Sequence, residues 1–289
     1  MIMKRSFFII AVACMIISGG PILIHAEKNP HYEKGQQLFE EKKYDEAFAE
    51  YKQALTTEDP QEKKFILLDM ASIHMNRKKY AEAAECYREA LKYDPDYLYT
   101  NEMLGIVLYG GLGDHKAALA PLLKAEELKS SNGLVYFALA CCYSLNNDRE
   151  NAFHYLDLAI LKIFRKAEYI ASEDFNNIKS DSRYINLAAN FGSIIEGDKY
   201  IYKAIESLAA ADNETAMKSY LRAAELYSKA LWEDSLNMDM LYSNMAMISF
   251  NMKNYENSIV YYEKLVSIRS RIYGEANNNT AAAYTGLGM

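Results

Sequence analysis

Small residues recur along the chain at a fixed distance from a tyrosine or leucine and from a second small residue. Each set begins with Ala, continues with a ring or Leu four positions later, and ends with Ala three positions further on. The sets in the first half of the chain are Ala47, Tyr51 and Ala54; Ala83, Tyr87 and Ala90; Ala118, Leu122 and Ala125; and Ala152, Leu156 and Ala159. The leading alanines are separated by 83−47=36, 118−83=35 and 152−118=34 residues. Apolar positions three and four apart share one helix face, and this period predicts a stack of helical repeats.

A further small residue precedes each set and predicts a first helix for each repeat. These residues are Gly35, Ala71, Gly105 and Ala140. At such positions two helix backbones can approach, and the bulky side chain of the partner helix fills the gap beside them. Asn76, Gly113 and the run Asn146-Asn147-Asp148 fall between the paired helices, where these residue types favour a turn. The third repeat has one extra residue at Gly110-Gly111, which predicts a loosened turn.

The last third of the chain repeats with a longer step. Ala216, Tyr220 and Ala223 correspond to Ser258, Tyr262 and Leu265, and 258−216=42. Two other residue classes share this period, namely Ala204, Ala246 and Gly288, and Tyr200, Tyr242 and Tyr284. The extra residues predict second helices that are longer by about two turns.

The N-terminus has the pattern of an export signal. Lys4 and Arg5 precede an apolar stretch from Phe7 to Ile17, and Ile24-His25-Ala26 offers a cleavage site after Ala26. The alternative is an uncleaved membrane anchor, because Phe7 to Ile24 is nearly long enough to span a bilayer. We therefore expect export to the periplasm or cell envelope, or anchoring in the inner membrane.

Together these patterns predict an all-α solenoid of antiparallel helix pairs in two arrays. The predicted parts are a signal peptide or anchor at residues 1–26, an array of about four repeats at 28–160, degenerate closing helices at 161–192 and a second array at 193–289. The segment from Ala276 to Met289 has no charged residue, so we expect the native chain to continue past it.

Composition argues against several functional classes. The 289 residues are 51% apolar with only 13 Gly and 5 Pro, which favours a large helical core. The formal charge of −7 disfavours nucleic acid as a partner. No His, Cys or Ser has the neighbours that metal binding or nucleophilic catalysis requires, so we predict no metal, no cofactor and no enzymatic activity. Cys86, Cys141 and Cys142 are interpreted as packing residues.

The spacing of Gly35, Tyr44, Ala47, Tyr51 and Ala54 resembles the tetratricopeptide repeat. The second set, Ala71 to Pro95, is the best match to this pattern. The segment from Ile268 to Gly288 resembles the kinesin-light-chain type of that repeat. This resemblance implies protein binding through a concave groove lined by the first helices, with the membrane involved only through an uncleaved N-terminal segment.

The resemblance also assigns residues to that groove. In the first array they are Tyr32, Gln36, Phe39, Phe65, Leu68, Ser72, Met75, Tyr99, Glu102, Ile106 and Phe137, and in the second Met240, Asn244, Met247 and Phe250. No Lys or Arg is among them, which argues against a clamp for a peptide carboxylate. Rings and aliphatic chains favour an apolar or helical peptide. The alternative is that some of these residues pack only against the next repeat.

Three functional hypotheses follow. The first is a protein-binding scaffold of the bacterial cell envelope. The second is the regulatory part of a longer enzyme whose effector domain lies beyond residue 289. The third is a purely structural spacer.

Overall fold

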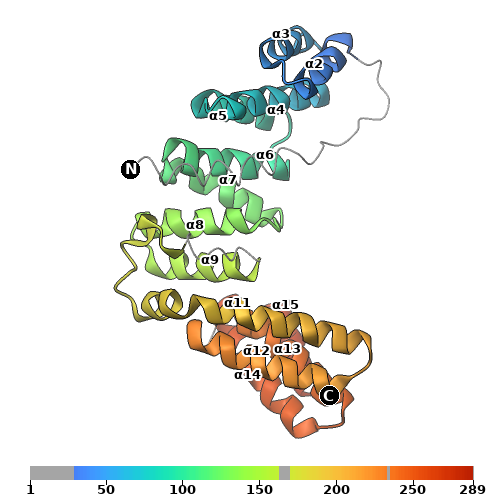
Figure 1. The fold of residues 1–289 in the computed structure, drawn as a ribbon, viewed down its shortest axis with the longest axis vertical. Helices are drawn as coiled ribbons and strands as arrows, with labels where there is room; N and C mark the ends of the chain where they lie inside the picture. The colour runs from blue at the N-terminus through green and yellow to red at the C-terminus, as the bar shows by residue number, and fades with distance from the viewer. Residues whose placement is uncertain (1–28, 163–169, 233–234, 289) are drawn as a thin grey trace. The chain divides into compact units, whose positions relative to one another are not determined.

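The structure is a computed structural model that describes residues 29–162, 170–232 and 235–288, and these residues form helices and turns without strands (Figure 1). The chain divides into two compact units, Met1–Cys142 (unit 1) and Tyr143–Met289 (unit 2). The division falls inside helix α8 (Gly133–Leu145). The predicted signal peptide and its cleavage site at Ala26 lie outside the described residues. Among the described helices, none combines the length and apolar character needed to cross a bilayer.

Unit 1 consists of antiparallel helix pairs that stack on one another. Its helices before α8 are α2 (Pro30–Glu40), α3 (Tyr44–Ala54), α4 (Pro60–Asn76), α5 (Tyr80–Tyr93), α6 (Leu98–Ile106), the π-helix η1 (Val107–Leu112) and α7 (His115–Glu127). Contacts are densest within the pairs α2–α3, α4–α5 and α6–α7, and α3–α4 and α5–α6 join successive pairs. This confirms the predicted all-α solenoid of helix pairs.

The α2–α3 and α6–α7 pairs each show a close approach between a glycine and a bulky residue. A Cβ atom at Gly35 would lie 2.5 Å from the ring of Tyr51, and one at Gly105 would lie 2.5 Å from Cγ of Leu122. Real side chains do not approach so closely, so only glycine fits at these two positions. Tyr51 and Leu122 are 1% and 0% exposed, so they fill the space that the glycines leave.

The extra residue of the third repeat is accommodated in a π-helical turn. α6 continues directly into η1, which ends before Gly113 at φ 72°. The i→i+5 hydrogen bond of a π-helix encloses one more residue than the i→i+4 bond of an α-helix, so a single π turn accommodates one inserted residue. A Cβ at Gly111 would lie 2.7 Å from Cγ of Tyr80, so this turn packs tightly on α5. The predicted loosened turn is therefore a tightly packed widening of the helix.

Most of the turns inside the helix pairs share one hydrogen-bond pattern. After α2, the N–H of Lys43 donates to Leu38 O and the N–H of Lys42 donates to Phe39 O. This is the Schellman arrangement, which places its C′ residue in the left-handed region. Inside the pairs, residues with positive φ and the same two bonds are Lys42, Lys78, Asn147, Ala211 and Lys253. Gly113 also has positive φ, but after the π-helical turn its N–H donates to Tyr109 O and that of Asp114 to Leu108 O, each one residue farther back. Asp or Asn follows Gly113 and three of the other residues and caps the next helix, at Asp114, Asp148, Asp212 and Asn254.

Unit 2 contains the elements that follow α8, and several of its helices are longer than those of unit 1. They are α9 (Arg149–Leu161), the 3-10 turn η2 (Glu173–Phe175), α11 (Ser182–Ala209), α12 (Asn213–Ala230), α13 (Leu236–Asn251), α14 (Tyr255–Tyr273) and α15 (Asn278–Leu287). The second helices α12 and α14 have 18 and 19 residues, compared with 11 in α3 and 14 in α5. The lengthening predicted from the 42-residue period is confirmed.

Two details of the second array differ from the repeat pattern. Ser258 replaces the usual alanine, and its hydroxyl donates to Ala246 O at 3.0 Å, so this polar group is satisfied inside the α13–α14 contact. Gly288 was expected within a first helix, but it is the C-cap of α15. Gly286 makes the close approach instead, toward the ring of Tyr262.

A buried carboxylate joins α9 to the start of α13. Asp157 is 3% exposed and accepts hydrogen bonds from Ser235 Oγ at 2.6 Å, Leu236 N at 2.5 Å and Asn237 Nδ2 at 2.6 Å. Desolvation raises the pKa of Asp157 to about 6, and the three donors act in the opposite direction. The carboxylate satisfies backbone and side-chain donors at a helix start that would otherwise be buried without partners.

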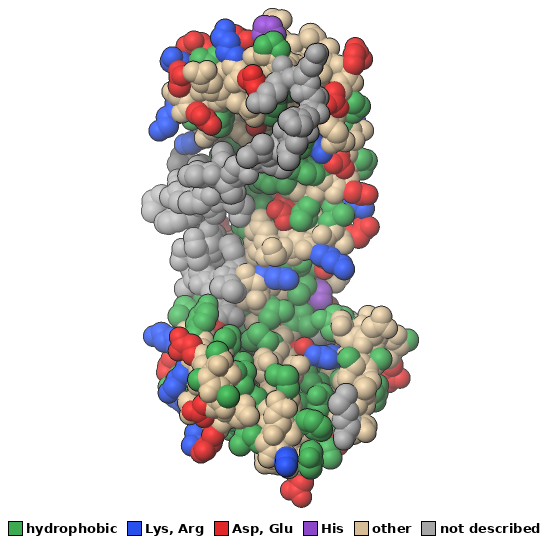
Figure 2. Space-filling view, turned by 90° about the vertical axis from the view of Figure 1, so that its right-hand side faces the viewer, with side chains coloured by type: hydrophobic (Ala, Val, Ile, Leu, Met, Phe, Trp, Pro, Cys, Tyr) green, Lys and Arg blue, Asp and Glu red, His purple; other side chains and the backbone are tan. Residues whose placement is uncertain are grey.

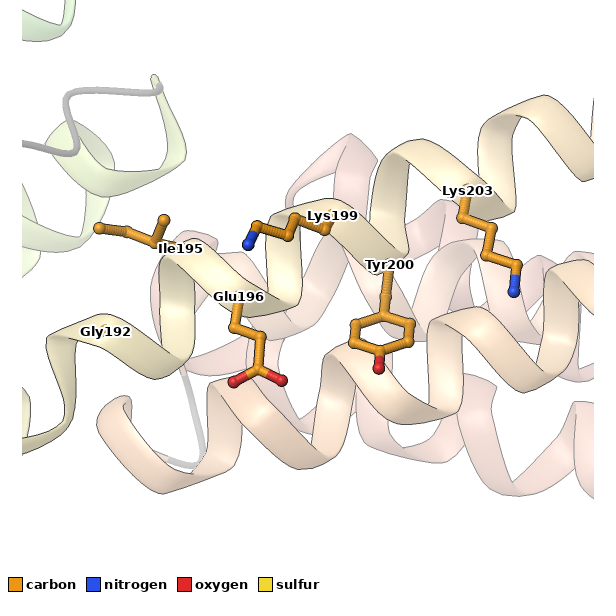
Figure 3. Close-up of a pocket in the computed structure, with 6 residues that line it drawn as sticks. All are labelled: Gly192, Ile195, Glu196, Lys199, Tyr200 and Lys203. Atoms are coloured by element: carbon orange, nitrogen blue, oxygen red, sulfur yellow. The ribbon is translucent and has the colours of Figure 1, made fainter.

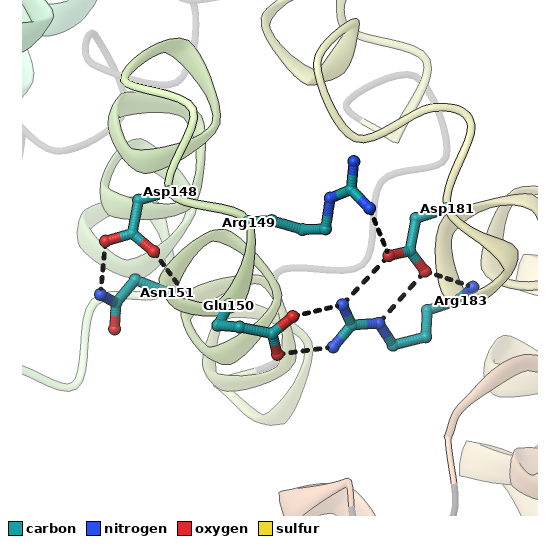
Figure 4. Close-up of polar contacts among 6 residues, drawn as sticks. All are labelled: Asp148, Arg149, Glu150, Asn151, Asp181 and Arg183. Atoms are coloured by element: carbon teal, nitrogen blue, oxygen red, sulfur yellow. Dashed lines mark hydrogen bonds and ion pairs between the residues drawn. The ribbon is translucent and has the colours of Figure 1, made fainter.

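A second polar network ties α9 to the start of α11 (Figure 4). The Arg183 guanidinium binds Glu150 through two bonds of 2.9 and 2.8 Å and also donates to Asp181. It lies 3.9 Å from the centre of the Phe153 ring. These contacts lower the pKa values of Glu150 and Asp181.

α11 itself continues through residue 192 without a break. The predicted boundaries of the arrays at residues 160 and 192 remain predictions.

Ala211→Gly is expected to stabilise unit 2 by about 0.5–1 kcal/mol, because a left-handed L-residue costs about 1–2 kcal/mol and glycine regains most of that. Urea unfolding followed by the fluorescence of Trp232 tests this, since the Trp232 ring lies 5.5 Å from that of Phe153. The control is Ala210→Gly, where φ is −88° and no gain is expected. A loss of stability in Ala211→Gly would contradict the assignment of strain to this turn.

Asp157 predicts a pH dependence of stability in unit 2. Its pKa of about 6 in the folded protein exceeds the ordinary value of 3.8, so the folded state binds the proton more tightly and stability falls as pH rises through this window. We expect unfolding by urea, read at Trp232, to show a loss of about 1 kcal/mol between pH 5 and pH 7 from this group. In Asp157→Asn, which is less stable at all pH values, this loss should be absent. An unchanged slope would assign the pH dependence elsewhere.

Candidate functional site

Two partly exposed tyrosine rings and one buried ring of unit 1 surround one carboxylate. Asp69 of α4 lies beside Tyr32 and Gln36 of α2 and Tyr51 of α3, whose side chains reach its carboxylate by hydrogen bonding. Tyr99 of α6 is also close enough for the carboxylate to raise its pKa. We call Tyr32, Gln36, Tyr51, Asp69 and Tyr99 the Asp69 cluster. Asp69, Tyr32 and Tyr99 are partly exposed and Gln36 is exposed, so the cluster lies at the surface of unit 1.

The Asp69 carboxylate is ionised at neutral pH and has no cation among the groups that shift its pKa. Desolvation raises its pKa to about 6, and the hydrogen bonds from Tyr32, Tyr51 and Gln36 lower it. Burial and the nearby carboxylate raise the pKa of Tyr99 to about 12, so this phenol stays neutral. A carboxylate offers about four acceptor sites, and the three neighbouring donors leave capacity for another.

The same unit shows how its rings and carboxylates hold a lysine. The Nζ of Lys64, which is 4% exposed, lies 2.8 Å from Asp94 Oδ2. It also lies 4.7 Å from the centre of the Phe65 ring and 4.2 Å from that of Tyr97. A carboxylate and two aromatic faces thus compensate a buried ammonium group. The Asp69 cluster has the same components, a carboxylate beside Tyr32 and Tyr99.

The structure divides the predicted groove residues of unit 1 into two groups. Partly or fully exposed side chains are those of Tyr32, Gln36, Phe39, Phe65, Ser72, Tyr99 and Glu102. Buried side chains are those of Leu68, Met75, Ile106 and Phe137, which are 7%, 7%, 0% and 4% exposed. The burial of these four side chains agrees with the alternative that some predicted groove residues serve only for packing. Groove binding by the exposed group stays a prediction.

In unit 2, the predicted residues lie along α13 and do not form a comparable cluster. Met247 and Phe250 are 47% and 38% exposed, and the Phe250 ring lies 5.6 Å from that of Tyr255. Met240 and Asn244 are partly buried. Asn244 Nδ2 donates to Met240 O at 3.0 Å within the helix, so part of its amide is already engaged.

Asp69 is the residue that sequence reasoning missed. It follows Phe65 by four positions and precedes Ser72 by three, so it shares their helix face. A single acid on an otherwise apolar face was the available signal. Its meaning depended on the tyrosines of α2, α3 and α6, which lie up to 37 positions away (69−32=37) and meet it only in the fold.

The cysteines do not form a reactive centre in the described part of the chain. Cys141 and Cys142 are buried, and burial raises the pKa of the partly exposed Cys86 thiol to about 11. Such a thiol is protonated at neutral pH and is a poor nucleophile. Within the same described residues, no group of three His, Cys, Asp or Glu side chains is arranged to hold a metal ion.

Comparison with known proteins identifies the class of protein. The sequence profile of the tetratricopeptide repeat matches residues 65–97 and, in a second form, residues 237–289. The first segment covers most of α4 and all of α5, and the second covers nearly all of α13 together with α14 and α15. The chain therefore contains tetratricopeptide repeats in both of its units.

Several solved structures are similar along most of the chain. The apo form of RapI shares 17% identity, with coverage of 84% of this chain and 97% of that one and a TM-score of 0.43. PilW, described as a type IV pilus biogenesis factor, shares 14% identity over 90% and 100%, with a TM-score of 0.37. YrrB, described as a TPR protein with an unusual peptide-binding site, shares 13% over 81% and 97%, also at 0.37. The search of curated proteins finds no match.

Proposed function

We propose that this protein is a non-enzymatic adaptor that binds a partner protein through the Asp69 cluster. The partner presents a mainly apolar peptide segment with one Lys or Arg side chain. The basic group contacts the Asp69 carboxylate, and the apolar part contacts the exposed rings of α2, α4 and α6. The observation that carries this proposal is an ionised, partly exposed carboxylate between tyrosines with no cation among the groups that shift its pKa.

Energetics favour a basic ligand over a neutral one. Desolvation already disfavours the charged form of Asp69, so a cation that approaches it offsets an existing cost. A ring face adds attraction for the same cation of about 0.5–2 kcal/mol. The Lys64 site of the same unit supports this reasoning, because there an ammonium group is held by Asp94 and two rings.

The rest of the segment is expected to be apolar. Tyr32, Phe39 and Phe65 are partly exposed around the cluster, and aromatic side chains contribute most of the energy in such interfaces. The chain as a whole has a formal charge of −7, which favours association with basic segments. The rings agree with the predicted apolar peptide ligand, and the negative charge adds one basic side chain to that prediction.

We also propose that the adaptor acts in the bacterial cell envelope. Lys4, Arg5 and the apolar stretch that follows them support export, with cleavage after Ala26.

Selection from a random displayed peptide library tests the binding proposal. We expect enriched peptides to contain one Lys or Arg flanked by apolar residues. Asp69→Asn should weaken their binding at least about tenfold, since a charge-assisted contact contributes about 1.5–3 kcal/mol. Fluorescence anisotropy with the enriched peptides measures this, and circular dichroism verifies the fold of the variant.

Glu46→Gln is the matched control, because it removes one negative charge from an exposed position of α3 and should leave affinity unchanged. Replacement of the basic residue by Met in the peptide should reproduce the effect of Asp69→Asn. Affinity should also fall as pH drops from 7 to 5, because protonation of Asp69 near pH 6 removes the charge. Enriched peptides without a basic residue, or no enrichment at all, would refute the proposal.

The location is tested separately. Expression of the full chain in a Gram-negative host, followed by fractionation and N-terminal mass spectrometry, should yield a periplasmic protein that begins at Glu27. A protein that retains Met1 and sediments with membranes would support the anchored alternative. An intact chain in the cytoplasm would refute export.

A further inference from the structure

Gly192 lies in the middle of α11, and the packing of unit 2 does not explain it. A Cβ atom at Gly192 would meet nothing within 4 Å, whereas one at Gly197 in the same helix would lie 2.7 Å from the Tyr227 ring. Packing therefore requires the second glycine and not the first. A glycine inside a helix costs about 1 kcal/mol relative to alanine. The bare backbone at Gly192 is explained if a bulky group from outside the chain lies against it.

An exposed stripe runs along α11 on both sides of this glycine. Its members follow each other at alternating steps of three and four, and they are Ile185, Ala188, Gly192, Ile195, Lys199, Tyr202, Glu206 and Ala209. Ile185, Ile195 and Tyr202 are 56%, 43% and 60% exposed. This spacing is that of helices that pair side by side. Apolar side chains also gather on the surface of unit 2 in Figure 2.

The centre of the stripe is hollowed. Gly192, Ile195, Glu196, Lys199, Tyr200 and Lys203 line an open depression of about 480 Å³. Figure 3 shows Ile195 and Lys199 extending to one side of α11, with Glu196 and Tyr200 directed to the other. The lining of the depression therefore combines Gly192 and the apolar Ile195 with charged side chains of both signs.

We propose that α11 pairs in antiparallel orientation with α11 of a second copy of this chain. Tyr202 of each copy then fills the space above Gly192 of the other. The same register places Ile185 opposite Ala209 and Ile195 opposite the methylene stem of Lys199. Large side chains thus meet small or flexible ones along the whole helix, and the two-fold symmetry makes the surface complementary to itself.

Charge favours the antiparallel arrangement over the parallel one. Near the symmetry axis, Glu196 of each copy lies beside Lys199 of the other, so the four central charges balance. In a parallel pair Lys199 would face Lys199, and Gly192 would face Gly192 with an unfilled gap between them. Like charges in contact and empty space both destabilise an interface.

Disulfide trapping tests the register. Under mild oxidation, the double variant Ile185→Cys/Ala209→Cys should form a covalent dimer, because these positions face each other across the interface. Either single variant should stay uncrosslinked. In the antiparallel register, position 185 of one copy and position 185 of the other are offset by 24 residues, which is about 36 Å along the helix at 1.5 Å per residue. The unsubstituted protein controls for Cys86. Crosslinking of the single variants would indicate a parallel pair and overturn the proposal.

Sedimentation of the full chain tests the association itself. The Gly192→Phe variant fills the depression, and it should weaken self-association at least about tenfold while leaving the helical signal and thermal stability intact. Lys199→Glu should also weaken it, and Glu196→Lys/Lys199→Glu should restore it. Ile259→Glu, at an exposed apolar position of α14, should have no effect. A chain that stays monomeric up to roughly 100 µM, where an association of about −5.5 kcal/mol would be half complete, overturns the proposal.

Discussion

The close approach of a glycine to a bulky residue, found in helix pairs of both units, fixes how near the paired helices lie. At Gly35 and Tyr51, and again at Gly197 and Tyr227, a single Cβ atom would overlap the facing ring. Such contacts set how near two helices lie, because a packed interior neither stretches nor leaves gaps. Repeated pair by pair in unit 1, the same spacing brings α2, α4 and α6 into succession. The Asp69 cluster exists because that succession aligns side chains from separate repeats.

Three buried or partly buried charged groups can be compared by the partners that compensate them. Asp157 is satisfied by three donors at the start of α13, and Lys64 is satisfied by Asp94 and two rings. Both are structural, because their partners are internal. Asp69, like Asp157, has neutral donors only, but its side chain is partly exposed whereas that of Asp157 is buried. This exposure is what supports the binding role proposed for Asp69.

Unit 2 uses its small residues in two ways. Gly197 faces α12, where it permits the Tyr227 contact, and Tyr227 in turn donates from its hydroxyl to Asp198 at 2.5 Å. Gly192 faces away from the packed side and has open space above it. The two glycines are five residues apart on one helix. Only their surroundings in the fold show that Gly197 is required for packing and that Gly192 lies at the surface.

The repeat period by itself determined the fold class, the pairing of helices and the longer second helices of unit 2. These follow from local sequence, because apolar spacing selects the helix face and small residues mark its contacts. Only the tertiary structure decided that the insertion at Gly110-Gly111 widens a helix, and that Ile106 and Phe137 are buried while Tyr32 and Tyr99 stay accessible. The reason is that burial, and the meaning of a lone carboxylate such as Asp69, depend on side chains that distant segments contribute, and no local pattern contains them.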